Sequence, residues 1–249
     1  MKYELEICVP SAEGAMIAQQ GGACRVELCA ALAIGGITPS IACIERVCSS
    51  VELDVYVLIR LREGHFVYTP SEVEEMCRDI RAACRVGADG FVFGALTPQG
   101  SYDYDANSRL LEAADGLPCT FHRAFDVAQH PKELLETLIE KGFRRVLTSG
   151  CAPTVLQGAS LLKELTEQAG QRIGIQCGGG VTPDNIEEIA SRTGVRMFHG
   201  SFRSTTPSPL LFDRPDIDMG ANADGSLYVT SLEKVAKARD LLSHFFHEN

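Results

Sequence analysis

The chain alternates short apolar segments with longer stretches in which apolar residues recur every three or four positions. The apolar segments are rich in Val, Ile, Leu and Phe, and each is long enough for one β-strand. They begin near Tyr3, Arg25, Asp54, Gly90, Cys119, Arg144, Arg172 and Met197. The stretches between them are too long for hairpins and leave room for one helix and two loops each time. The pattern therefore predicts a strand followed by a helix, eight times over.

The predicted helices have recognisable ends. Thr69-Pro70 precedes a stretch in which Val73, Met76 and Ile80 fall on one face. A Thr cap followed by Pro at the first helical position is typical of a helix start. Eight strand–helix units in 249 residues predict a single closed (β/α)8 barrel of the TIM type, which spans residues 1–249 without an internal domain boundary.

A doubly wound parallel sheet is the competing architecture. It would contain fewer strands and would usually carry a glycine-rich phosphate loop after the first strand. This chain has Pro10-Ser11-Ala12-Glu13 at that place, so the barrel is favoured.

One segment departs from the strand–helix pattern. Residues 203–231 are rich in Pro, Gly, Asp and Ser and show no usable period. They predict a long irregular loop at the carboxyl end of the eighth strand, and loops of this length are usually functional or disordered.

Composition and charge restrict the partners and the compartment. The net charge of −10 argues against nucleic acid or an anionic membrane as a partner, because binding phosphates needs a basic face. The amino-terminal residues show no signal peptide and no segment is apolar enough to span a membrane, which predicts a cytoplasmic protein. In that reducing compartment we expect the ten cysteines to be free thiols.

Polar residues stand at the predicted carboxyl end of nearly every strand, where barrels of this type build their sites. Packing alone would favour Val, Ile or Leu there. The candidate ligand-binding residues are Glu6, Arg25, Arg60, Arg123, Ser149, Gly178, Gly179, Gly180, His199 and Ser201.

The first two strands share a Glu-apolar-Cys pattern, which places Glu6 on the same face as Cys8 and Glu27 on the same face as Cys29. Neighbouring parallel strands could bring the two thiols together, and two thiolates can hold a soft ion such as Cu(I). The alternative is that the cysteines only fill the barrel and the glutamates pair with arginines.

Two further segments could carry chemistry. An inward-facing His122, with Arg123 and Asp126 just beyond it, could shuttle a proton on an anionic substrate, although a histidine at a strand end is often only structural. The Gly178–Gly180 turn could cradle a phosphate with free backbone N–H groups, or could be a tight turn without a ligand.

Some chemistries are disfavoured by what the strand ends lack. No Lys stands at a predicted carboxyl end, which argues against a Schiff-base aldolase. The His-x-His and His-Glu-x-x-His patterns of hydrolytic zinc sites do not occur.

Taken together, the motifs resemble those of the CutC family. The resemblance runs from about Glu4 to Ser204 and rests on EICV, RVELC, GGITPS, VLIRLREG, GADGFVFGAL, TFHRAFD, RVLTSG, GGG and FHGSFRS. It implies a cytoplasmic TIM barrel, usually a homo-oligomer such as a dimer or tetramer, named for copper homeostasis. It also implies Cys8 and Cys29 as the copper-binding candidates.

Two hypotheses of different class follow. The first is a copper homeostasis protein that binds Cu(I) through Cys8 and Cys29. The second is an enzyme acting on a small anionic or phosphorylated metabolite, with His122, Glu27 and Asp126 as acid/base candidates. A ligand-binding barrel without chemistry is a third, weaker possibility.

Overall fold

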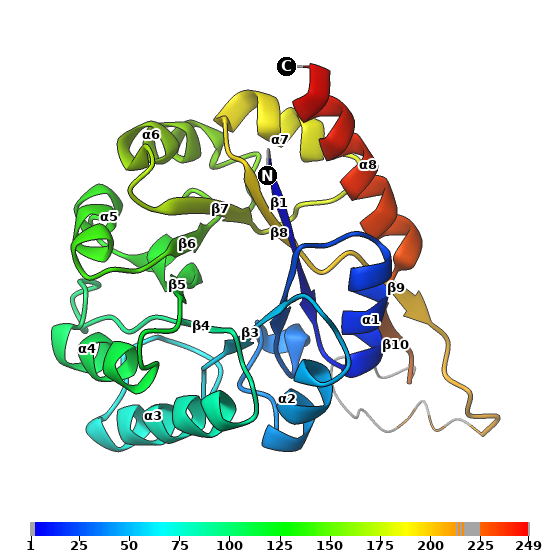
Figure 1. Ribbon diagram of the computed structural model, residues 1–249, viewed down its shortest axis with the longest axis horizontal. Helices are drawn as coiled ribbons and strands as arrows, with labels where there is room; N and C mark the ends of the chain where they lie inside the picture. The colour runs from blue at the N-terminus through cyan, green and yellow to red at the C-terminus, as the bar shows by residue number, and fades with distance from the viewer. Residues whose placement is uncertain (1–2, 213, 215, 217–224, 249) are drawn as a thin grey trace.

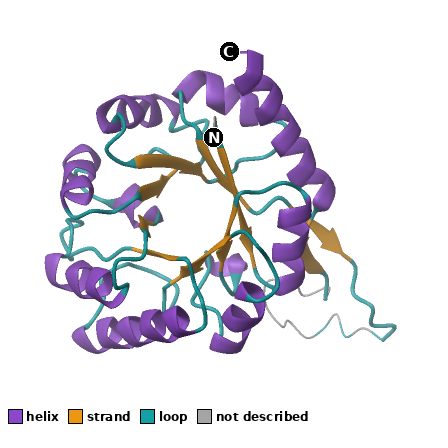
Figure 2. Cartoon of the chain, viewed as in Figure 1, coloured by secondary structure: helices purple, strands orange, loops and turns teal. Residues whose placement is uncertain are grey.

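The computed structural model describes residues 3–212, 214, 216 and 225–248. Eight parallel strands form a closed barrel in chain order, and the last strand pairs with the first. Helices surround this barrel on all sides (Figures 1 and 2). The prediction of a TIM (β/α)8 barrel is therefore confirmed. The strands are β1 (Glu4–Val9), β2 (Arg25–Leu28), β3 (Asp54–Leu58), β4 (Gly90–Phe93), β5 (Cys119–Phe121), β6 (Arg145–Thr148), β7 (Gly174–Gly178) and β8 (Met197–Gly200).

Several helices begin at a residue whose side chain caps them. Before α3, the Thr69 hydroxyl accepts the backbone N–H of Glu72, whose carboxylate accepts the N–H of Thr69 in return. The α-helices are α1 (Ala12–Gln20), α2 (Ile41–Cys48), α3 (Pro70–Arg85), α4 (Tyr104–Ala113), α5 (Pro131–Glu140), α6 (Ala159–Ala169), α7 (Ile186–Thr193) and α8 (Leu232–Glu248). Two short 3₁₀ helices, η1 (Leu32–Ile34) and η2 (Arg123–Val127), follow β2 and β5. No helix within the described ranges is long and apolar enough to cross a membrane.

Residues along each strand alternate between two environments. On β1, Leu5, Ile7 and Val9 belong to the apolar core shared with the surrounding helices. Cys8 belongs instead to a small cluster inside the barrel, together with Cys29 and Tyr56 among others. This alternation aims one set of side chains at the helices and the other at the barrel axis, as the two-residue period of a strand requires.

The segment after β8 differs from its prediction at both ends. The predicted eighth strand ran on to Arg203, but β8 ends at Gly200, and Phe202 adopts a positive φ of 41°. The chain then forms β9 (Arg203–Thr206), which pairs antiparallel with β10 (Leu227–Thr230). The expected irregular loop at 203–231 is therefore wrong at its two ends, and much of its middle lies outside the described residues.

Candidate functional site

A cavity of about 470 Å³ opens at the carboxyl ends of the strands. We call it the mouth cavity. It lies where barrels of this type build their sites, and its size is that of a pocket for a small organic molecule. Its lining residues are Cys8, Glu27, Cys29, Leu32, Gly35, Leu58, Arg60, Phe66, His122, Arg123, Leu147, Gly179, Gly180, Val181, Thr182, His199, Gly200, Ser201 and Arg203.

Two thiols meet on one side of the mouth cavity. The Sγ atoms of Cys8 and Cys29 lie 3.1 Å apart, and both residues are buried. Cys8 stands on β1 opposite Glu27, and Cys29 directly follows β2, so parallel pairing of these strands brings the sulfur atoms together. The hydrogen bond with Cys29 and burial together raise the pKa of the Cys8 thiol well above 9.0. We refer to Cys8, Cys29, Glu27 and His199 as the thiol side.

A series of contacts between charged side chains holds the thiol side in position. Arg25 forms an ion pair with Glu6, whose second oxygen accepts a hydrogen bond from His199 Nδ1 at 2.7 Å. Barrel closure makes this contact possible, because Glu6 on β1 pairs with His199 on β8. Burial opposes the ionisation of Glu6, but Arg25 and His199 outweigh it and hold its pKa far below the usual range. Glu6 therefore remains a carboxylate.

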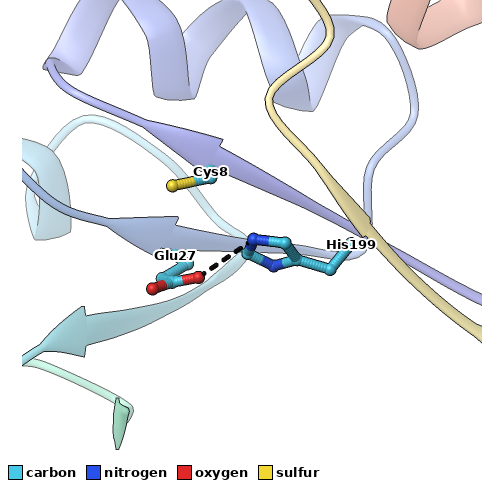
Figure 3. A group of neighbouring side chains, drawn as sticks. All are labelled: Cys8, Glu27 and His199. Atoms are coloured by element: carbon cyan, nitrogen blue, oxygen red, sulfur yellow. Dashed lines mark ion pairs between the residues drawn. The ribbon is translucent and has the colours of Figure 1, made fainter. Parts of the chain in front are cut away.

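The same histidine reaches a second carboxyl group. His199 Nε2 lies 3.2 Å from a carboxyl oxygen of Glu27 (Figure 3). Burial raises the pKa of Glu27 to about 7, and the nearby Glu6 charge acts in the same direction. Burial disfavours the charged form of His199, yet Glu27 and Glu6 raise its pKa above 6.5. The pKa values of His199 and Glu27 are therefore set by each other's charge as well as by burial.

Three groups of the thiol side have the spacing of metal ligands. One potential ligand atom each from Cys8, Glu27 and His199 lies within 4.8 Å of the other two. In Figure 3 the Cys8 sulfur and the Glu27 carboxyl group both lie near the His199 ring. The Cys29 thiol adjoins this group through its contact with Cys8. The donors therefore combine soft sulfur, imidazole nitrogen and one carboxylate.

Another part of the mouth cavity is built around His122. Its Nδ1 accepts the backbone N–H of Ala124 at 3.2 Å and thereby caps η2. Burial, together with the positive charge of Arg60, lowers the pKa of His122 to about 3. The ring is therefore neutral and carries its proton on Nε2. No residue that the structure describes accepts a hydrogen bond from this buried Nε2.

Arg60 fixes the loops next to His122. Its Nη1 donates to the carbonyl oxygens of Ile34 and Gly36, and its Nη2 donates to that of Gly64, each at 3.1 Å. Its guanidinium lies over the Phe66 ring, which in turn contacts the His122 ring.

Arg123 is oriented by groups behind the cavity wall. It donates from Nε to Asp126 at 2.7 Å and from Nη2 to the Ser149 hydroxyl at 2.9 Å. Asp126 also accepts the backbone N–H groups of Ser149 and Cys151 and the Thr148 hydroxyl. Asp126 is therefore fully engaged in holding the β6 end and Arg123, which removes the structural basis for its predicted acid/base role.

The glycine turn after β7 lies beside Arg123. Gly179 and Gly180 have φ values of 117° and 80°, in the region that favours glycine. A Cβ on Gly179 would lie 3.4 Å from the Arg123 guanidinium. Across the described residues, the backbone N–H groups of Gly180, Val181 and Ser201 have no hydrogen-bond partner. We refer to His122, Arg60, Arg123, the turn at 179–181, Ser201 and Arg203 as the donor side.

The structure brings most of the predicted site residues to one cavity. Those that line it are Cys8, Glu27, Cys29, Arg60, His122, Arg123, Gly179, Gly180, His199 and Ser201. Five others do not, namely Glu6, Arg25, Asp126, Ser149 and Gly178. Glu6 and Arg25 lie below the thiol side, and Asp126 and Ser149 lie behind Arg123, so these four hold lining residues in place. Sequence reasoning missed Phe66, which comes from a loop without any strand or motif signal.

Comparison with known proteins agrees with these motifs. A model of the CutC family matches residues 3–204. The chain belongs to the CutC family. It is 48% identical over 245 residues to the CutC protein of Porphyromonas gingivalis, covering 97% of this chain and 99% of that protein. It is 46% identical to the human copper homeostasis protein cutC homolog, covering 96% of this chain and 88% of the human protein.

A solved structure agrees as well. The crystal structure of CutC from Streptococcus agalactiae matches with a TM-score of 0.76 and 36% identity, over 80% of this chain and 98% of that one. The family resemblance drawn from the strand-end motifs is therefore confirmed, and this CutC protein is a homologue of copper homeostasis proteins.

Proposed function

We propose that this CutC protein acts in copper homeostasis by binding one Cu(I) ion between the sulfur atoms of Cys8 and Cys29. The observation that carries the proposal is the 3.1 Å contact of two buried thiols at the edge of an open cavity. Thiolates are the ligands that select Cu(I) over harder ions. The names of the human and Streptococcus agalactiae relatives point to the same metal.

The surroundings suit the charge that such a site would carry. The Cys8 thiol is protonated in the metal-free protein, because its pKa lies well above 9.0, so metal binding releases this proton. When both residues bind as thiolates, neither sulfur atom has a proton to donate, so the thiol–thiol hydrogen bond is lost and the sulfur atoms can separate to hold the metal between them. Two thiolates and one Cu(I) leave one negative charge, and the His199 ring, whose pKa is raised above 6.5 by Glu27 and Glu6, lies beside Cys8.

The proposal is tested by an anaerobic Cu(I) titration against a competing chelator. We expect one ion per chain in the wild type and none in the Cys8→Ser/Cys29→Ser variant. A Cys48→Ser/Cys84→Ser variant is the matched control, because it removes two part-exposed thiols from α2 and α3. Equal loss in both double variants, or tight binding that survives without Cys8 and Cys29, would overturn the proposal.

The alternative of an acid/base enzyme has less support from the geometry. The Nδ1 of His122 is occupied by the Ala124 N–H, and Asp126 is engaged by four donors or more. Glu27 is the one acid/base candidate that lines the cavity with a pKa near neutrality. The cytoplasmic location and the homo-oligomeric state, dimer or tetramer, remain predictions.

A further inference from the structure

We propose that the donor side of the mouth cavity is a binding site for a small organic anion, a phosphate monoester or a carboxylate, to which His122 Nε2–H donates a hydrogen bond. This site is separate in its residues from the Cu(I) site and does not depend on it. It gives the cavity a second ligand of a different chemical class.

The volume of the cavity is the first argument. About 470 Å³ far exceeds what one metal ion between two adjacent thiols occupies. Cavities of roughly 300 to 1,000 Å³ are typical of sites for small organic molecules and cofactors. Because the thiols lie on one side only, most of the lining has no role in holding copper.

The charge of the lining is the second argument. The whole chain carries a net charge of −10, yet the cavity is lined by three arginines, Arg60, Arg123 and Arg203, and by one carboxyl group, Glu27. Arg203 lies over the Tyr228 ring and has no carboxylate partner among the described residues. A pocket with this excess of guanidinium groups in an acidic protein attracts anions.

An unpartnered donor is the third argument. The His122 side chain is 5% exposed, and its Nε2–H has no acceptor within the described residues. A buried donor without a partner is unfavourable, yet the structure retains this one in the wall of the cavity. An oxygen acceptor brought by a ligand would satisfy it.

The other end of the donor side suits the anionic group itself. Gly180, Val181 and Ser201 line the cavity with backbone N–H groups that are unpaired in the described structure, and Arg123 lies over this turn. Asp126 and Ser149 hold Arg123 in position before a ligand arrives. Several fixed donors around one point match the several oxygens of a phosphate or carboxylate.

The neutrality of His122 determines what it can do. With Nδ1 committed to Ala124, the ring offers only an N–H donor and no acceptor. It therefore selects an oxygen of the ligand and is not a base that removes its proton. A neutral imidazole in this role binds the ligand through its N–H group. Because the pKa of His122 is about 3, the ring stays neutral over the whole neutral pH range.

The test is isothermal titration of the reduced, metal-free protein with three probes: inorganic phosphate, glycerol 3-phosphate and malate. We expect saturable binding of at least one probe, weakened about tenfold or more in His122→Asn. Asn retains an acceptor for the Ala124 N–H, because Asn side chains are good helix caps, but it cannot place a donor where Nε2 lies. The thermal midpoint of this variant shows that it remains folded.

A control variant makes the result specific. Arg192→Gln removes a half-exposed arginine on α7 and should leave binding unchanged. Because the probes are titrated against the metal-free protein, failure of the copper proposal does not decide this one. Preference for the phosphate probes or for malate identifies the anionic group. Absence of binding by the wild type, or equal binding by His122→Asn, would overturn the proposal.

Discussion

The thiol side and the donor side share one cavity, but the groups around their two histidines shift the pKa values in opposite directions. His199 lies between two carboxyl groups, which raise its pKa, whereas His122 lies beside Arg60 in an apolar wall and has a pKa of about 3. On the thiol side, the pKa values of Glu27 and His199 are both raised above their usual range. On the donor side, His122 stays neutral near neutral pH. Proximity in a barrel therefore does not impose a common chemistry, because each side chain responds to its immediate neighbours.

The largest expected effect concerns the ion pair of Arg25 with Glu6 beneath the thiol side. In Arg25→Met, Glu6 would remain buried at 1% exposure without its guanidinium partner. We expect a loss of about 3–5 kcal/mol in the free energy of unfolding, measured by urea denaturation. The control is Arg78→Met, whose arginine is 75% exposed and pairs with Glu74, and it should cost under about 1 kcal/mol. Similar costs for the two variants would contradict the role given to Arg25.

The next largest effect is the contribution of His122 to the pH dependence of stability. Folded His122 stays neutral down to about pH 3, whereas in the unfolded chain it binds a proton below about 6.5. The unfolded state therefore binds more protons in this window, so His122 makes stability fall as the pH falls, by at most about 1.4 kcal/mol per pH unit. His122→Asn should lack this contribution.

The measurement is the difference in unfolding free energy between wild type and His122→Asn at several pH values from 7 to 4. Glu27, with its pKa raised to about 7, acts in the opposite sense, since its contribution is lost as the pH rises. It does so in both proteins and cancels in the difference. A difference that does not vary with pH would show that His122 has the same pKa in the folded and the unfolded chain, which would contradict its buried neutral state.

The smallest effect concerns which metals the thiol side prefers. Glu27→Gln should change Cu(I) affinity by less than about tenfold, because the soft ion is held by sulfur. The same change should weaken Zn²⁺ binding by about tenfold or more, since zinc accepts Cys, His and carboxylate ligands together. Parallel competition titrations with both metals check this. Equal losses for both would make Glu27 a ligand of copper as well.

Much of the fold could be predicted because strand and helix periods are local properties. The exception is the segment after β8, where Gly200 ends the strand and Phe202 turns the chain with a positive φ. The pairing of β9 with β10 joins short segments far apart in the sequence, with Thr206 opposite Leu227. No local sequence pattern predicts such a pairing, since each strand has only four residues.

The candidate site could also be predicted only in part. The two-residue period and the adjacency of the first two strands were enough to bring Cys8 and Cys29 together. The bridge from Glu6 through His199 to Glu27 was not, because it depends on closure between the first and last strands. Which ring nitrogen of His122 carries the proton depends on one backbone contact with Ala124, which the residue type alone does not reveal.

Closure of the barrel also determines when the site can form during synthesis of the chain. The thiols of Cys8 and Cys29 leave the ribosome well before His199, which follows Glu6 by 193 residues. At about 5–20 residues per second, the nascent chain exposes both thiols for roughly 10–40 seconds before β8 can dock. During that interval the cysteines have neither the histidine nor the barrel wall around them. The finished site therefore exists only after β8 has docked against β1, long after its two cysteines have been made.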